Sequence, residues 1–190
     1  MTNQTPEQKA RDEIDKMLVA AGWLVQSKNK VNLSVGKGVA VREYQTDVGP
    51  ADYVLFVNGK PVGIIEAKRK EEGERLTIHE DQAEYYAKAT LKYNLNKEPL
   101  PFVYESTGAL TRFTDCHDPK PRSRPIFHFH KPETLAEWQG QTETLRARLK
   151  KMPGLDEQGL RPAQIKAIKN LETSFKKNRP RALIQMATGA

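Results

Sequence analysis

One short stretch constrains the fold of this 190-residue chain more than any other, the sequence GPADYVLFVNGKPVGIIEAKRK at residues 49–70. Two runs of apolar, strand-forming residues flank the Asn58-Gly59 pair, which is a strong signal for the tight turn of a β-hairpin. Charged residues stand at the outer ends, with Asp52 in front and Glu66 and Lys68 at the back. A buried strand pair does not need charges at these points, so the stretch predicts a functional site carried by a hairpin.

The register of the hairpin decides whether these charges meet. A strict two-residue turn places Asp52 opposite Ile65 and turns Glu66 to the other face, because side chains alternate along a strand. A bulge at Gly59, or a loop of three or five residues, shifts the pairing by one residue. Asp52 then lies opposite Glu66, and Lys68 follows on the same face. A shared site needs the second register, so we predict the bulge or the odd loop.

The three charged side chains suit phosphodiester chemistry. Two neighbouring carboxylates repel each other, and one takes up a proton unless a cation lies between them. Mg²⁺ prefers oxygen ligands and commonly uses one or two carboxylates together with water. Such a metal activates water and contacts a scissile phosphate, while Lys68 would orient the water or neutralise charge on the phosphate. The alternative is that Glu66 and Lys68 form an exposed ion pair where the strand emerges into solvent.

A helix expected at residues 77–91 brings two further candidates. Gln82 and Tyr86 are four residues apart and therefore share a helix face. Gln82 could bind a phosphate or the catalytic lysine, and Tyr86 offers a hydroxyl and a ring for stacking. The alternative is that Tyr86 packs in the core and Gln82 is solvated.

Other charged residues are weaker candidates. Glu13, or its neighbours Asp12 and Glu7, would bring a further acid from the first helix, although each also suits an ordinary solvated helix face. Basic residues gather near the predicted site and would contact phosphates without reading the sequence of the bases. These basic residues are Arg69, Lys70, Arg75, Lys120, Arg122 and Arg124.

Periodicity and turn signals predict the order of the remaining elements. Helices are expected at residues 6–21, 77–91, 133–151 and 162–176. Strands are expected at residues 39–44, 52–57, 62–67, 100–107, 110–115, 126–130 and 181–187. The histidines His128 and His130 alternate on one of these strands, but with Cys116 and His117 they match no standard zinc spacing.

The composition excludes several classes of protein. With 37% hydrophobic and 29% charged residues, the chain has the composition of a soluble globular protein. Apolar runs are too short to span a membrane, and the N-terminus lacks the apolar core of a secretory signal. The single cysteine fits a reducing compartment, so a cytoplasmic location is expected. The net charge of +7 favours a polyanionic partner.

In this order, Asp52, Glu66-x-Lys68 and Gln82-x-x-x-Tyr86 resemble the PD-(D/E)xK nuclease superfamily, in its branch with a Q-x-x-x-Y motif. The proline of that motif is displaced, because Ala51 separates Pro50 from Asp52. Together with the hairpin, the sequence IDKMLVAAGW at residues 14–23 is similar to the motor (R) subunit of Type I restriction enzymes.

The tail strengthens this resemblance. In GLRPAQIKAIKNL, Gln164 stands where superfamily 2 helicases place an adenine-reading glutamine. The sequence LIQMATGA resembles the start of their Walker A motif, in which Thr188 and Gly189 would belong to a phosphate-binding turn. The lysine and hydroxyl residue of the complete motif are absent, so no ATPase activity is expected of this chain.

The resemblance implies an α/β fold, a PD-(D/E)xK restriction-endonuclease-like core with a central mixed sheet flanked by helices. It implies a nuclease domain at residues 1–152, followed at 153–190 by a linker and the truncated start of a helicase domain. The full subunit would be an Mg²⁺-dependent endonuclease without its own sequence specificity. It would translocate double-stranded DNA with ATP, in a complex with methylation and specificity subunits. The alternatives are the nuclease of a Type III restriction or repair helicase–nuclease, and a non-catalytic DNA-binding or docking domain.

Overall fold

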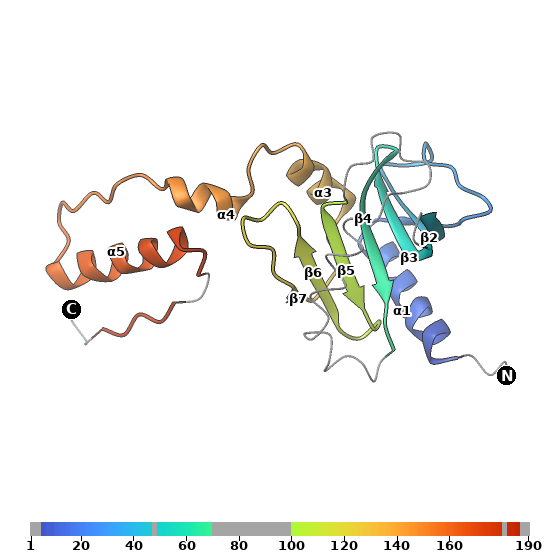
Figure 1. Ribbon diagram of the computed structural model, residues 1–190, viewed down its shortest axis with the longest axis horizontal. Helices are drawn as coiled ribbons and strands as arrows, with labels where there is room; N and C mark the ends of the chain where they lie inside the picture. The colour runs from blue at the N-terminus through green and yellow to red at the C-terminus, as the bar shows by residue number, and fades with distance from the viewer. Residues whose placement is uncertain (1–4, 47–48, 70–99, 180–181, 187–190) are drawn as a thin grey trace. The chain divides into compact units, whose positions relative to one another are not determined.

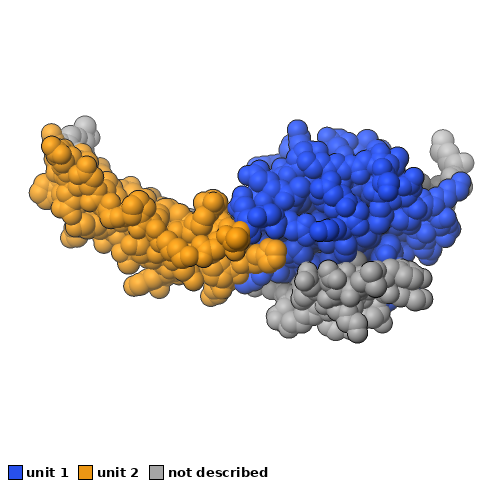
Figure 2. All heavy atoms as spheres, turned by 90° about the horizontal axis from the view of Figure 1, so that it is seen from above, with its two compact units in different colours: residues 1–116, 121–141 blue, residues 117–120, 142–190 orange. Residues whose placement is uncertain are grey.

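A computed structural model describes residues 5–46, 49–69, 100–179 and 182–186 (Figure 1). The helix expected at residues 77–91, with Gln82 and Tyr86, lies outside the described residues. The chain divides into two compact units, coloured separately in Figure 2. Unit 1 comprises Met1–Cys116 and Pro121–Gln141, and unit 2 comprises His117–Lys120 and Thr142–Ala190. The boundary expected at residues 152 and 153 concerns the domains of a longer protein and stays a prediction.

Unit 1 is built on a seven-stranded mixed sheet whose spatial order follows the sequence (Figure 1). Two neighbouring pairs, β1 with β2 and β4 with β5, are parallel, and the other four pairs are antiparallel. The predicted α/β fold with a mixed sheet and packed helices is therefore confirmed. The strands are β1 (Leu24–Ser27), β2 (Gly38–Thr46), β3 (Gly49–Val57), β4 (Lys60–Ala67), β5 (Phe102–Ser106), β6 (Thr111–Asp115) and β7 (Arg124–Ile126).

Helices α1 (Pro6–Ala20) and α3 (Pro132–Gln139) pack on one face of this sheet. Helix α1 begins with a capping box between Thr5 and Gln8, as expected for a threonine followed three residues later by glutamine. Its apolar stripe is buried against the sheet, and Leu135 of α3 joins the same core. Alternate residues of the central strands form a second apolar cluster on the opposite face.

Gly63 allows β4 and β5 to approach closely. A Cβ atom at this position would lie 2.4 Å from the backbone oxygen of Phe102 and 2.9 Å from its Cβ atom. We expect Gly63→Ala to lower the free energy of unfolding by about 3 kcal/mol, because backbone has to move to relieve the overlap. Urea denaturation measures the change. Gly140→Ala is the matched control, since a Cβ there would meet ordinary contacts of 3.6 Å, and an equal loss in both variants would contradict the prediction.

His130 belongs to an aromatic cluster in unit 1. Its ring lies 4.5 Å from that of Phe113 and 4.8 Å from that of Trp138, measured between ring centroids. The hydroxyl of Tyr104 lies 2.7 Å from His130 Nδ1. Burial lowers the pKa of His130 to about 4 and raises the pKa of Tyr104 well above its usual value. His130 and Tyr104 are therefore both neutral at pH 7, and the hydrogen bond between them has a structural role.

Acid is expected to destabilise this cluster. The pKa of His130 falls from 6.5 in the unfolded chain to about 4 in the folded one, so the unfolded state binds more protons between these pH values. The free energy of unfolding therefore decreases as pH falls through this window, by roughly 1–2 kcal/mol after allowance for partial exposure. Urea denaturation at pH 7 and 4.5 measures the loss. His130→Asn should reduce it and the exposed control His128→Asn should not; equal pH dependence in both variants would count against the assignment.

Two expectations about the elements that follow β6 in unit 1 are wrong, and one strand near the N-terminus was missed. The strand predicted at residues 126–130 does not form there. The observed strand β7 ends at Ile126, and the next residue, Phe127, is 93% exposed. The helix predicted at 133–151 ends at Gly140, and a new helix starts after the capping residue Thr144. A strand not expected from the sequence, β1, pairs in parallel with β2.

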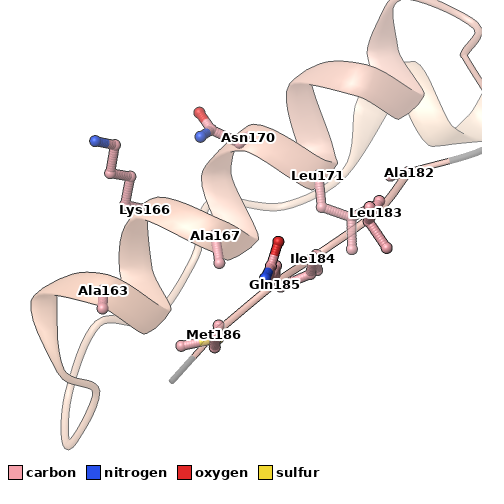
Figure 3. Close-up of a pocket in the computed structure, with 10 residues that line it drawn as sticks. All are labelled: Ala163, Lys166, Ala167, Asn170, Leu171, Ala182, Leu183, Ile184, Gln185 and Met186. Carbon is pink, nitrogen blue, oxygen red and sulfur yellow. The ribbon is translucent and has the colours of Figure 1, made fainter.

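Unit 2 contains the helices α4 (Leu145–Arg148), η2 (Leu149–Lys151) and α5 (Pro162–Lys176). Helix α5 matches its prediction, but residues 182–186 do not form the expected strand. They run along α5 and line a groove with Ala167 and Leu171 (Figure 3). Leu183 is 92% exposed, and the described residues supply no neighbouring strand for this segment, which explains why it remains extended without a ladder. Among the described residues, no helix is long and apolar enough to cross a membrane.

Candidate active site

The hairpin of β3 and β4 adopts the register that a shared site requires. Near the turn, Val57 pairs with Lys60 and Phe56 with Pro61, as in a two-residue loop. Beyond an irregularity the pairs are Leu55 with Gly63 and Tyr53 with Ile65. The predicted shift is therefore confirmed, but its predicted place was wrong. Val62 is the extra residue, and the Asn58-Gly59 turn keeps both residues at positive φ, 49° and 75°.

Asp52 is fixed at both oxygens of its carboxylate. Oδ1 accepts a hydrogen bond of 2.5 Å from Nη2 of Arg11, which lies on α1. Oδ2 accepts a hydrogen bond of 2.9 Å from the backbone N–H of Ala67, at the end of β4. The side chain of Asp52 is only 17% exposed. These contacts bring the carboxylate from the front of the hairpin to the peptide that follows Glu66.

Glu66 is a buried carboxylate with 8% of its surface exposed. Burial is the main cause that raises its pKa to about 7, and the charge of Asp52 raises it further. The positive charges of Lys68 and Arg11 act in the opposite direction. The backbone N–H of Lys68 donates to the carbonyl of Ser106 over 2.8 Å, which fixes the chain where it leaves β4. The structure thus brings the three residues predicted from the hairpin into one electrostatic environment.

Two residues of this environment were missed by the sequence analysis. Glu105, on β5, is 4% exposed, pairs in register with Glu66 and raises its pKa. Arg11 reaches Asp52 from α1, where the sequence analysis had looked only for an acid. Its position beside the apolar stripe, three residues before the buried Ile14, was an available signal.

The place of the acid candidate Glu13 in the site stays a prediction. Its side chain is 55% exposed and pairs with Lys16 over 2.7 Å on the same helix. Arg69 is exposed directly after the hairpin, whereas Lys70, Gln82 and Tyr86 lie outside the described residues.

In unit 2, Gln164 has a local structural role. Its side-chain oxygen accepts a hydrogen bond of 3.0 Å from the backbone N–H of Arg161 and so caps α5. Thr188 and Gly189, the other residues of the expected nucleotide site, lie outside the described residues.

The donor set is compatible with a magnesium ion bound by few protein ligands. No group of three or more His, Cys, Asp or Glu side chains that could hold a metal occurs among the residues that the structure describes. The zinc candidates Cys116, His117, His128 and His130 therefore do not form such a group either. Asp52 and Glu66 are the two carboxylates of this site that could hold such an ion, which commonly keeps several waters. Burial raises the pKa of Glu66, and the negative charges of Asp52 and Glu105 raise it further, so a bound cation would stabilise the ionised carboxylate.

Comparison with known proteins places the chain in a family. Residues 24–139 match the family described as "Type I restriction enzyme EcoKI endonuclease subunit second domain". The chain is 27% identical to the Type I restriction enzyme EcoKI endonuclease subunit of Escherichia coli strain K12, over 96% of this chain. It spans 20% of the length of that relative.

Among solved structures, a fragment of a putative HsdR subunit of a type I restriction enzyme from Vibrio vulnificus YJ016 is similar to this chain. The match has a TM-score of 0.47 and 19% identity, and it covers 98% of this chain and 35% of the other. The family match alone covers more than half of the 190 residues, from β1 through α3. The chain therefore belongs to the family of Type I restriction enzyme endonuclease subunits.

Proposed function

We propose that unit 1 is a PD-(D/E)xK nuclease domain that hydrolyses DNA phosphodiester bonds with Mg²⁺. The observation that carries this proposal is the shifted register of the hairpin. It brings Asp52 to the β4 backbone at Ala67, beside the buried Glu66, whose pKa responds to the charges of both Asp52 and Lys68. A structural hairpin gains nothing from two neighbouring carboxylates, one of which is costly to ionise.

The three residues have two roles in this proposal, metal binding and charge neutralisation. Asp52 and Glu66 would hold Mg²⁺, and burial keeps the second carboxylate from being fully hydrated. When bound, Mg²⁺ supplies positive charge for the phosphate oxygens and makes water a stronger nucleophile. Lys68 would orient the attacking water and neutralise charge that develops on the phosphate.

Contacts with DNA would involve the phosphate backbone. Arg69 is exposed directly after the site, and Lys70, Gln82 and Tyr86 follow it in the sequence, with Gln82 and Tyr86 supporting either the DNA or Lys68. A basic chain with a net charge of +7 suits a partner recognised by charge. We expect cutting without base preference by this domain itself.

The rest of the proposed mechanism belongs to a longer protein. In the full-length subunit, ATP-driven translocation of double-stranded DNA would deliver the substrate, and the methylation and specificity subunits would choose the recognition site. Gln164, Thr188 and Gly189 would contribute to the ATP site of that motor. The complex would act on DNA in the cytoplasm.

The test is cutting by the reconstituted complex that contains the full-length subunit. Asp52→Asn and Lys68→Met are expected to reduce cutting at least about 100-fold, because each removes charge at the reacting phosphate. ATP hydrolysis and translocation should continue at the wild-type rate. Arg69→Met is the control outside the triad and should only weaken DNA binding, with a smaller salt dependence than the wild type. Normal cutting by Asp52→Asn would reject the proposal in favour of a non-catalytic DNA-binding domain.

A further inference from the structure

Four charged side chains of alternating sign lead from the surface to Asp52. Lys28 Nζ lies 3.0 Å from Glu43, and Glu43 lies 3.3 Å from Nη1 of Arg11. Nη2 of the same guanidinium binds Asp52 over 2.5 Å. The exposed fraction of the side chains decreases along this array, from 49% for Lys28 to 37% for Arg11 and 17% for Asp52. The four residues come from four different segments, so the array joins α1 to the sheet at the candidate site.

Arg11 itself is held on several sides. Its backbone carbonyl accepts a hydrogen bond of 3.2 Å from the hydroxyl of Tyr53, the residue next to Asp52. Its Nε is buried, and its two terminal nitrogens bind different carboxylates. A guanidinium is a planar fork, so two fixed partners set its orientation as well as its position. This differs from a mobile surface lysine.

The backbone at Glu43 supports a functional reading of this array. Glu43 has a φ of 50°, in the left-handed region that residues with a Cβ atom rarely adopt. Such conformations persist only where neighbouring contacts enforce them, and they concentrate at functional sites. Here the conformation accompanies the contacts of Glu43 with both Lys28 and Arg11.

We propose that Arg11 is a positioning residue that orients the carboxylate of Asp52 for metal binding. Arg11 binds Oδ1 and the N–H of Ala67 binds Oδ2, so the carboxylate cannot rotate about its terminal bond without losing both contacts. Each oxygen keeps a further lone pair for a metal. Hydrogen bonds to a ligating carboxylate fix its geometry in this way, and their loss typically weakens metal affinity 10–100-fold. The inference rests on the proposed function for the identity of the ligand.

A second ion pair between α1 and the sheet provides a matched control. Arg42 of β2 binds Asp15 of α1 through two nitrogens, and the hydroxyl of Tyr53 donates to the same Asp15 over 2.9 Å. This pair docks the helix but does not contact Asp52. Arg42→Met therefore removes a guanidinium–carboxylate pair from the same helix–sheet interface and reports the purely structural effect.

The first experiment follows the Ala67 amide in the metal-free chain. Because that N–H donates to Asp52, its hydrogen exchange, measured by NMR, reports how firmly the carboxylate is held. We expect exchange at Ala67 to become at least about tenfold faster in Arg11→Met, to recover in part in Arg11→Lys, and to stay unchanged in Arg42→Met. Unchanged exchange in Arg11→Met, or an equal increase in Arg42→Met, would overturn the inference, whatever the metal does.

The second experiment measures Mn²⁺ binding by calorimetry. Affinity is expected to fall at least about tenfold in Arg11→Met and to remain at the wild-type value in Arg42→Met. Wild-type or tighter binding by Arg11→Met would reject the positioning role. If the wild-type chain itself takes up no Mn²⁺ and Asp52→Asn still cuts DNA in the complex, the proposed function fails instead. The exchange experiment then decides alone whether Arg11 orients Asp52.

Discussion

Replacing Glu66 with glutamine is expected to abolish DNA cutting while making the metal-free protein more stable. Cutting by the reconstituted complex should fall at least about 1000-fold, because a neutral amide is a poor ligand for a hard cation and supplies no negative charge to hold it. Glutamine has nearly the same shape, so the packing of β4 should be preserved. A substitution that lowers activity but raises stability identifies a residue that is retained for function.

The stability change has a defined pH dependence. The pKa of Glu66 is about 7 in the folded chain and 4.5 in the unfolded chain, so the folded state binds more protons between these values. The stabilising contribution of protonated Glu66 is complete below pH 4.5 and is lost as pH rises through 7. Above pH 7 the wild-type protein carries a buried charge that glutamine lacks. Glu66→Gln should therefore gain roughly 2 kcal/mol at pH 8 and little at pH 5.

Urea denaturation at pH 5 and pH 8 measures this difference. Adding Mn²⁺ should stabilise the wild type and leave Glu66→Gln unchanged, since only a ligand that binds the folded state shifts the equilibrium. Glu105→Gln is the matched control, because this neighbouring buried glutamate is not placed at the metal in our proposal. A destabilising effect of Glu66→Gln at pH 8 in the absence of metal would show that the ionised carboxylate has a structural role.

Deleting Val62 is expected to destroy the site and most of the stability of unit 1. The deletion removes the extra residue of the bulge, so β4 beyond it would change faces relative to β3. Glu66 would then turn toward the core that contains Ile14 and Leu18, where an unpaired carboxylate is very unfavourable. We expect the free energy of unfolding to fall by at least about 4 kcal/mol.

Val62→Ala separates the bulge from the side chain. Val62 is fully buried in the core cluster, so truncation should cost roughly 2 kcal/mol through the cavity it leaves. The substitution keeps the residue count of β4, and metal binding should survive. Urea denaturation and Mn²⁺ calorimetry on both variants test the pair of expectations. If the deletion cost no more than Val62→Ala, the turn would be able to absorb the lost residue, and the bulge would not determine the site.

Local signals were sufficient for much of the fold. The hairpin, α1 and α5 appeared near their predicted bounds because their turn, capping and periodic signals act over a few residues. Predictions failed where the conformation of a segment depends on residues that are distant in sequence. β1 contains only Leu24–Ser27, and its strand conformation depends on the parallel ladder with β2. Residues 182–186 have the composition of a strand, but a strand requires a neighbour, and the described residues provide none.

For the candidate site, the sequence by itself determined the charged residues of the hairpin and the need for a shifted register. Because side chains alternate between the two faces of a strand, the number of residues between Asp52 and Glu66 shows that they share a face only in the shifted register. Only the tertiary structure decided that the shift occurs at Val62, because the close approach of Gly63 to Phe102 fixes β4 against β5 beyond that point. Tertiary contacts were needed to show that Arg11 and Glu105, which lie far from the hairpin in sequence, belong to the site. Sheet pairing and helix docking bring them to Asp52 and Glu66, and these long-range contacts set the charge balance on which the site depends.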